Sequence, residues 1–223
     1  MNALRKKFLI RSSYTLRLSF TSLLLAFSGC CTMPASTEDP VFQSKYSQFA
    51  YCGFETTKQS RNTSCGSACL VSVLKYWGNI VSEEEIFHEF PVPSEEGYSV
   101  VDLKNIAKRN SLDAYALTMQ RNPLAQLEDQ IHKGRPVICA VRFPWHLYFA
   151  YDVPIYGQTY RTLAWIFGPR KNHYIVVFGI KDDKFMIMDP AYGFVTLSQK
   201  QFERCWSKRA YGVVLCAKKS NEG

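Results

Sequence analysis

Cys65 is the residue whose type and position most favour covalent chemistry. It lies in RNTSCGSACLVSVLKYWG, residues 61–78, directly before a helical pattern. In the first turn of a helix a thiol faces unpaired backbone N–H groups and the positive end of the helix dipole, and both favour the nucleophilic thiolate. Gly66 would let a substrate backbone come close. Two plainer interpretations stay open: a buried thiol, or a disulfide with Cys69 one turn later.

A nucleophilic thiol needs an imidazole to share its proton, and the chain has four histidines. His88 lies in an acidic helix and His132 near a helix end, so we expect both to be solvated. His146 lies among aromatic residues and is a secondary candidate. His173 opens the strongly apolar strand HYIVVFGI, where a polar side chain needs a reason to be, so it is our first choice for the base.

Asp189 is the expected partner of His173, because it ends the next strand, KFMIMD, just before Pro190. Antiparallel strands joined by a tight turn place the start of one beside the end of the next, so the two side chains should be neighbours. A carboxylate there would orient the imidazole; otherwise the pair is an ordinary histidine beside a turn aspartate. Gln59, six residues before Cys65, could fold back and join the Cys65 N–H as a donor to a tetrahedral oxyanion.

The elements that must position these residues follow an α+β pattern, with helices first and an antiparallel sheet afterwards. Helical spacing and capping residues predict the helices, and apolar runs between turn residues predict the strands. We expect helices at 65–77, from 82, at 99–110, 124–134 and 198–206, and strands at 135–141, 173–180, 184–189, 193–197 and 211–216. They form a single domain over residues 58–217, with a tail at 218–223.

The N-terminus has the pattern of an export signal over residues 1–29. The apolar run LSFTSLLLAF is too short to span a bilayer as a helix, and five basic residues accompany it: Arg5, Lys6, Lys7, Arg11 and Arg17. FSGC resembles a bacterial lipobox, which would lipidate Cys30 and anchor the protein in a membrane, with Cys31 as a rival site. The alternative is an ordinary cleaved signal. Both place the protein in the periplasm or cell envelope, and the aperiodic residues 30–57 predict a tether.

The net charge and the aromatic residues indicate which kinds of partner the protein could bind. The formal charge of +8 falls to +3 once the five N-terminal basic residues are set aside. That ordinary balance gives no case for a nucleic-acid partner. A long aromatic-rich connection at 142–172 predicts either a folded-back hairpin or a wall of a substrate cleft.

The remaining cysteines could form disulfides in an oxidising compartment. The pair that we favour is Cys205 with Cys216, which flank a short turn-rich segment. Other pairings stay open, because six thiols allow many combinations. The candidates are Cys31, Cys52, Cys69, Cys139, Cys205 and Cys216.

Three motifs together resemble one family. QSRNTSCGSACL, NHYIVVFGI and MDPAYG, within residues 57–217, are similar to the double-glycine leader peptidases that process bacteriocin precursors, family 39 of the cysteine peptidases. The resemblance implies a papain-like α+β fold without metal or cofactor. It implies that Cys65 is the nucleophile, His173 the general base, Asp189 the orienting residue and Gln59 the oxyanion donor.

The same resemblance sets expectations for the substrate. It implies a peptide or protein substrate, cut after a Gly-Gly type site. In the family's best-known members this domain is the cytosolic N-terminal part of an ATP-driven exporter, whereas here an export signal precedes it and no transporter is expected. A neighbouring exporter or secretion system could supply the target. The alternatives are a papain-like hydrolase of cell-wall stem peptides, or a catalytically silent binding or assembly lipoprotein.

Overall fold

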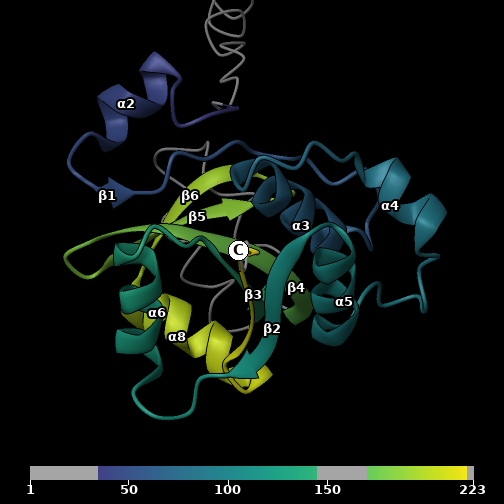
Figure 1. Cartoon of the computed structure of the whole chain (residues 1–223). Coiled ribbons are helices and arrows are strands. Elements are labelled where there is room, and N and C mark those ends of the chain that lie inside the picture. The colour runs from purple at the N-terminus through teal and green to yellow at the C-terminus, as the bar shows by residue number, and fades with distance from the viewer. Residues whose placement is uncertain (1–34, 145–169, 220–223) are drawn as a thin grey trace, which may run out of the picture. The chain divides into compact units, whose positions relative to one another are not determined.

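The computed structural model describes residues 35–144 and 170–219 (Figure 1). Its helices are α2 (Pro40–Tyr46), α3 (Cys65–Tyr76), α4 (Glu83–Glu89), α5 (Val100–Arg109), α6 (Pro123–His132), α8 (Gln199–Trp206) and the 3-10 turn η3 (Ser207–Arg209). Its strands are β1 (Ala50–Tyr51), β2 (Leu112–Thr118), β3 (Val137–Pro144), β4 (Arg170–Lys181), β5 (Lys184–Asp189), β6 (Gly193–Ser198) and β7 (Gly212–Lys218). The α+β class is confirmed.

The strands form one antiparallel sheet in the order β2-β7-β3-β4-β5-β6, and β1 pairs with β4. β4 and β5 are joined by a tight turn in which Asp182 has φ 50°. β5 and β6 are joined by a second turn that closes on the pair Asp189 and Gly193. The two turns place the start of β4 and the end of β5 at one edge of the sheet, as the sequence predicts.

Helices cover both faces of the sheet (Figure 1). Successive side chains along a strand point to opposite faces, so neighbouring residues of β4 join different cores. Val176 belongs to the core that includes Leu103 of α5, while Val177 belongs to the core that includes Trp206 of α8. β4 is therefore buried from both sides, which explains its long apolar run.

The tether expected over residues 30–57 is wrong for its described part. Phe42 of α2 is fully buried, and its ring centroid lies 4.8 Å from that of Phe194. β1 lies on β4 beside Gly179, where a Cβ would come within 2.7 Å of the Tyr51 Cβ. Polar composition conceals this segment because only a few aromatic side chains fix it to the core. The packed unit thus begins well before residue 58.

β2 is the other element that the sequence analysis missed. Its sequence, LDAYALT, contains aspartate and two alanines, which are depleted in strands. Leu112 and Ala114 are nonetheless buried, because the strand pairs along its whole length with β7. Tertiary pairing therefore overrides a weak local preference.

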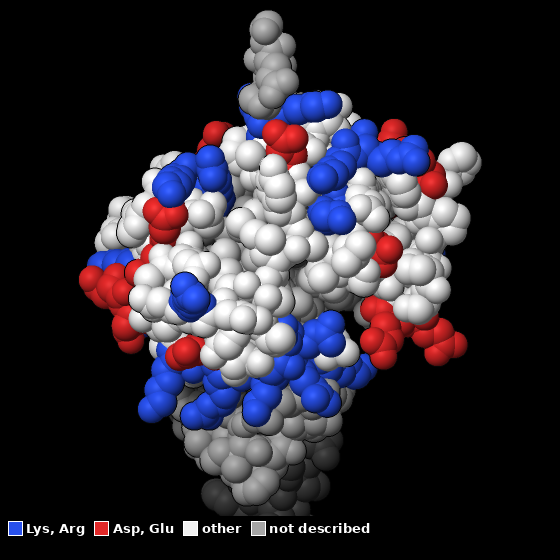
Figure 2. All heavy atoms as spheres, turned by 60° about the horizontal axis from the view of Figure 1, so that its bottom comes forward, with Lys and Arg blue, Asp and Glu red and all other residues white. Residues whose placement is uncertain are grey.

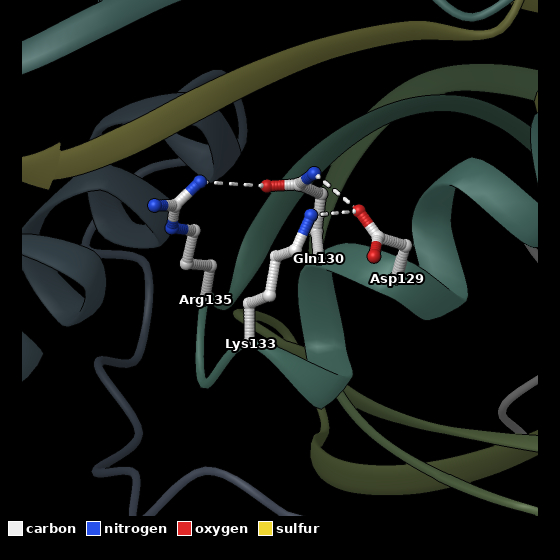
Figure 3. A network of polar contacts seen from close by, with 4 residues as sticks. All are labelled: Asp129, Gln130, Lys133 and Arg135. Atoms are coloured by element: carbon white, nitrogen blue, oxygen red, sulfur yellow. Dashed lines mark hydrogen bonds and ion pairs between the residues drawn. The ribbon is translucent and has the colours of Figure 1, made fainter.

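The end of α6 leads directly into β3, and Figure 3 shows the polar contacts around it. Lys133 Nζ lies 2.6 Å from Asp129 Oδ2, and Arg135 Nη1 donates to Gln130 Oε1 at 3.4 Å. Exposed contacts of this kind contribute little to the stability of the fold. The helix ends at this point because of Gly134. Its φ of +69° suits glycine, and its N–H donates to the Ile131 carbonyl of α6.

The predicted disulfide between Cys205 and Cys216 is wrong. Cys205 of α8 belongs to the core on one face of the sheet, and Cys216 of β7 belongs to the core on the other. Their closeness in sequence could not reveal this, since the face depends on the strand register. No disulfide joins any of the six described cysteines.

Charged side chains of both signs are interspersed over most of the face in Figure 2, with basic ones gathered along its lower border. This mixture agrees with the small net charge expected beyond the N-terminal residues. Within residues 35–144 and 170–219, no helix is both long and apolar enough to cross a bilayer. In the same ranges, His, Cys, Asp and Glu do not gather in threes that could hold a metal ion.

Candidate active site

Cys65 begins α3 with its backbone donors uncapped. The preceding residue, Ser64, is the N-cap but makes no side-chain cap bond. Its hydroxyl instead accepts from the Arg61 N–H and donates to the Arg61 carbonyl, both at 3.0 Å. The first N–H groups of α3 are thus left by the cap residue to serve the sulfur and any bound oxyanion. Cys65 itself is 8% exposed, so a small reactant can reach it.

The role expected for Gly66 is wrong. It is buried, and a Cβ at this position would lie 3.2 Å from Tyr174 Cδ2 and 3.3 Å from Leu103 Cδ1. Gly66 therefore lets α3 approach β4 and α5 closely, and does not face a substrate. Its effect on the site is indirect, since this close packing fixes how near the start of α3, and so Cys65, lies to β4.

His173 and Asp189 are neighbours, as the strand pairing predicts. His173 Nε2 lies 3.0 Å from Asp189 Oδ2, and the Cys65 sulfur lies near enough to the imidazole to help raise the pKa of His173. Asp189 is fully buried, and its Oδ1 accepts the Ala191 N–H at 2.8 Å. With Nε2 turned to the carboxylate, Nδ1 is the ring nitrogen left for the thiol. The side chains of Cys65, His173 and Asp189 thus lie together in one group.

The charges around His173 favour the protonated form of its imidazole. Burial lowers the pKa of His173, but the Asp189 carboxylate, the hydrogen bond to it and the Cys65 sulfur outweigh burial and raise this pKa to about 10. A protonated His173 beside Cys65 can stabilise a thiolate and later supply a proton.

Gln59 is held next to the carboxylate hairpin. Its backbone N–H donates to the carbonyl of Pro190, the residue after Asp189, at 2.9 Å. The side chain is half-buried, and its Oε1 is buried without a hydrogen-bond partner among the described residues. An amide with one unsatisfied end beside the hairpin is poised to bind a further polar group.

A pocket of about 410 Å³ opens beside Gln59. Its lining is polar and basic, and it spans both the segment before α3 and the hairpin after β5: Lys58, Gln59, Ser60, Arg61, Asn62 and Ala191. Two larger hollows, of about 650 and 520 Å³, contain none of the four predicted site residues in their lining. Of these three hollows, the pocket at Gln59 is therefore the one whose lining includes a predicted site residue.

A buried carboxylate that the sequence analysis did not single out also lies here. Glu83 is 9% exposed; its Oε2 accepts the Ser60 N–H at 2.9 Å and its Oε1 accepts the Ser67 hydroxyl at 2.7 Å. The box is formed by its neighbour Glu85 with Ser82. The only signal in the sequence was that one of three consecutive glutamates had to face inward.

The other histidines and Cys69 are not part of the group formed by Cys65, His173 and Asp189. His88 and His132 are exposed, as expected, whereas His146 and the connection 145–169 lie outside the described residues. Burial raises the pKa of Cys69 well above its usual value, so this thiol stays protonated. The expectation of a Cys65–Cys69 disulfide as an alternative is not met.

Known proteins share this architecture. The peptidase domain of a Streptococcus ComA transporter matches 74% of this chain and 98% of its own, with 20% identity and a TM-score of 0.53. A double-glycine motif protease from an AMS/PCAT transporter, solved with its leader peptide, matches 76% and 95%, with 19% identity and a TM-score of 0.53. These likenesses establish the papain-like α+β fold.

Sequence comparison agrees with the fold. The lactococcin-G-processing and transport ATP-binding protein LagD of Lactococcus lactis is 24% identical over 165 residues, which are 74% of this chain but only 19% of LagD. The chain therefore spans about a fifth of that relative. Residues 46–214 match the family described as Peptidase_C39 like. The chain is a member of the Peptidase_C39 like family.

Proposed function

We propose that the protein is a cysteine endopeptidase in which Cys65, His173, Asp189 and Gln59 carry the reaction. The observation that supports this most is the 3.0 Å contact between His173 Nε2 and the buried Asp189 carboxylate, with the Cys65 sulfur near enough to influence the pKa of the same ring. A carboxylate fixed by a backbone N–H holds the ring, so its free nitrogen is aimed at the sulfur.

In the first half of the reaction, the Cys65 thiolate attacks the substrate carbonyl carbon. The carbonyl electrons move onto oxygen, and the oxyanion is bound by the Cys65 N–H and the Gln59 amide. Protonated His173 then gives its proton to the leaving amine as the C–N bond breaks, which leaves a thioester on Cys65.

In the second half, neutral His173 removes a proton from water, and the hydroxide attacks the thioester. The tetrahedral adduct collapses, the carboxylic acid leaves, and Cys65 and His173 return to their starting forms, a thiolate and a protonated imidazole. Asp189 stays ionised throughout and keeps the ring oriented.

We further propose a polypeptide substrate in the periplasm or cell envelope, cut after a Gly-Gly type site. LagD is named for processing lactococcin G, and the AMS/PCAT protease is described as acting on a double-glycine motif. The N-terminal pattern supports export, with Cys30 as the lipid anchor, and an exporter or secretion system would deliver the target.

The test uses the purified protein and its Cys65→Ala variant. Each is incubated with envelope and secreted protein extract, and new N-termini are mapped by mass spectrometry. New ends that depend on Cys65 and follow a shared motif support the proposal, and Gly-Gly before the cut supports the proposed site. Identical N-termini from both proteins would refute proteolysis, and release of fragments from purified muropeptides would then favour the cell-wall alternative.

A further inference from the structure

The segment that carries Gln59 is held from two sides. On one side the Gln59 N–H bonds to the Pro190 carbonyl at 2.9 Å. On the other, the N–H of the next residue, Ser60, donates to Glu83 Oε2 at 2.9 Å. The Gln59 N–H belongs to the peptide before the Gln59 Cα and the Ser60 N–H to the peptide after it, so the two bonds hold both peptide planes that flank this Cα. They therefore restrict where the Gln59 side chain can point.

Glu83 connects this segment to the helix of the nucleophile. Its second oxygen accepts the Ser67 hydroxyl at 2.7 Å, and Ser67 lies two residues after Cys65 in α3 and is fully buried. Ser67 Oγ also lies 2.9 Å from the Ser64 carbonyl at the start of the same helix. One carboxylate thus spans the distance between the Gln59 segment and the first turn of α3.

The burial of Glu83 needs an explanation. A carboxylate removed from water is costly unless it is well paired. Among the described residues no Lys, Arg or His forms an ion pair with Glu83. Its partners are one backbone amide and one hydroxyl, both belonging to segments that carry proposed site residues. This placement favours a role in holding the site.

We propose that Glu83 is a positioning residue that sets the oxyanion donor Gln59 relative to Cys65. The inference rests on the proposed function of Gln59. Among the described residues, Glu83 makes no hydrogen bond or ion pair with the Cys65 sulfur or the His173 imidazole, and it acts through the Ser60 amide.

Two substitutions separate geometry from charge. In Glu83→Gln, the new amide oxygen can accept the Ser60 N–H, and its NH₂ can donate to Ser67 Oγ while the Ser67 hydroxyl turns to the Ser64 carbonyl. Both connections survive without the charge. In Glu83→Asp the charge survives, but the side chain is one methylene shorter and cannot span both partners. Glu83→Ala removes both connections.

The main experiment measures kcat and KM on a peptidyl-Gly-Gly aminocoumarin amide with the full-length protein. Removing one oxyanion donor costs on the order of 10²–10³ in kcat, so we expect Glu83→Ala to lose about 10- to 100-fold in kcat with little change in KM. Glu83→Asp should lose activity too, while Glu83→Gln should stay close to wild type. Exposed Glu84, next along α4, gives the matched control Glu84→Ala, which should be unchanged.

A second readout isolates the oxyanion hole. Alkylation of Cys65 by iodoacetamide forms no oxyanion, so its rate should be the same in wild type and Glu83→Ala. Binding of a peptidyl-Gly-glycinal, which forms a tetrahedral adduct, should weaken in parallel with kcat. In a Gln59→Ala background, Glu83→Ala should cost little more, because both changes remove the same donor.

Several outcomes would overturn the inference: full kcat in Glu83→Ala, an equal further loss in the Gln59→Ala background, or activity in Glu83→Asp with none in Glu83→Gln. If Glu83→Ala does not fold, the Asp and Gln variants carry the comparison. Hydrogen exchange of the Ser60 amide, measured by NMR, needs no turnover. Protection that is lost in Glu83→Asp and kept in Glu83→Gln supports the positioning role even if the proposed peptidase activity fails, and unchanged protection in both refutes it.

Discussion

Gln59 and Asp189 lie far apart in the sequence, yet one backbone bond brings their segments together in the fold. The Gln59 N–H donates to the carbonyl of Pro190, which directly follows Asp189. The proposed oxyanion donor and the carboxylate that orients the base are therefore parts of one local structure. A change in the hairpin after β5 should disturb both functions together.

The proposed roles predict a graded series of variants. Cys65→Ala should abolish turnover without unfolding the protein, and His173→Ala should do nearly the same. Asp189→Asn should lower kcat by on the order of 10⁴-fold and leave residual activity. The reason is that Oδ1 must stay an acceptor for the Ala191 N–H, so the new NH₂ would face His173 Nε2 and force the wrong tautomer. Turnover of the coumarin peptide checks the order, and an active Cys65→Ala protein would contradict the assignment.

The electrostatics of His173 predict a pH dependence of stability. Burial alone would lower the pKa of His173. The nearby Asp189 carboxylate outweighs burial, and the pKa rises from the ordinary 6.5 to about 10 in the folded protein. The folded state then holds a proton that the unfolded chain releases. The resulting stabilisation is complete below about pH 6.5 and is lost as the pH approaches 10.

Urea unfolding of wild type and His173→Gln at a series of pH values measures this effect. The difference in free energy of unfolding should shrink as the pH rises from about 6.5 to about 10. Taking the difference removes the contribution of other groups that titrate in this range. A difference that grows with pH would show that the histidine is neutral in the fold.

Gly97 predicts a strain effect near the nucleophile. It is buried with φ +85°, and a Cβ would clash with the carbonyl oxygen of Thr63, two residues before Cys65. Gly97→Ala should destabilise the protein by about 1–3 kcal/mol and reduce activity. Gly53→Ala is the matched control, because nothing lies within 4 Å of a Cβ there. Thermal unfolding of the two variants decides the question, and equal midpoints would contradict the clash.

The packing of α2 predicts that residues before 58 are needed for stability. Phe42 is fully buried against aromatic rings of the sheet, whereas Val41 beside it is 64% exposed. Phe42→Ala should cost about 3–5 kcal/mol in free energy of unfolding, and Val41→Ala should cost little. A chain that begins at residue 58 should unfold in less urea than one that begins at residue 35. Similar midpoints for these two chains would restore the idea of a tether.

Thiol chemistry should single out Cys65. The other described cysteines are at most 5% exposed, and burial raises the pKa of Cys52 to about 11 and that of Cys216 to about 12. Brief treatment of the native, unreduced protein with iodoacetamide should therefore label Cys65 among the six described cysteines. In urea all six should react without a reducing agent. A Cys205–Cys216 peptide pair that resists labelling would contradict the fold.

Local signals in the sequence predicted most elements correctly. The capping serines Ser82, Ser99 and Ser198 each begin a helix with a complete capping box. The apolar strands were found because their periodicity and turns are local. The contact between His173 and Asp189 followed from one tight turn, and needed no knowledge of the rest of the fold.

Features that depend on distant partners could not be read in this way. α2 and β2 are held by aromatic packing and by pairing with β7, respectively. Glu83 has its hydrogen-bond partners 23 and 16 residues away, at Ser60 and Ser67. The local sequence SEEE at residues 82–85 therefore could not show that this glutamate points inward. Gly66 was assigned to the substrate because its packing against Tyr174 arises only when α3 meets the sheet.

The position of β7 has a consequence for biosynthesis. It fills the gap between β2 and β3, so neither strand has its full set of neighbours until residues 212–218 have left the ribosome. A nascent chain that lacks them cannot complete the sheet on which the proposed site is built. Synthesis order alone would then keep the peptidase inactive while it is being made. For a protein that we propose to be exported, such late completion would also leave time for the translocation machinery to engage it.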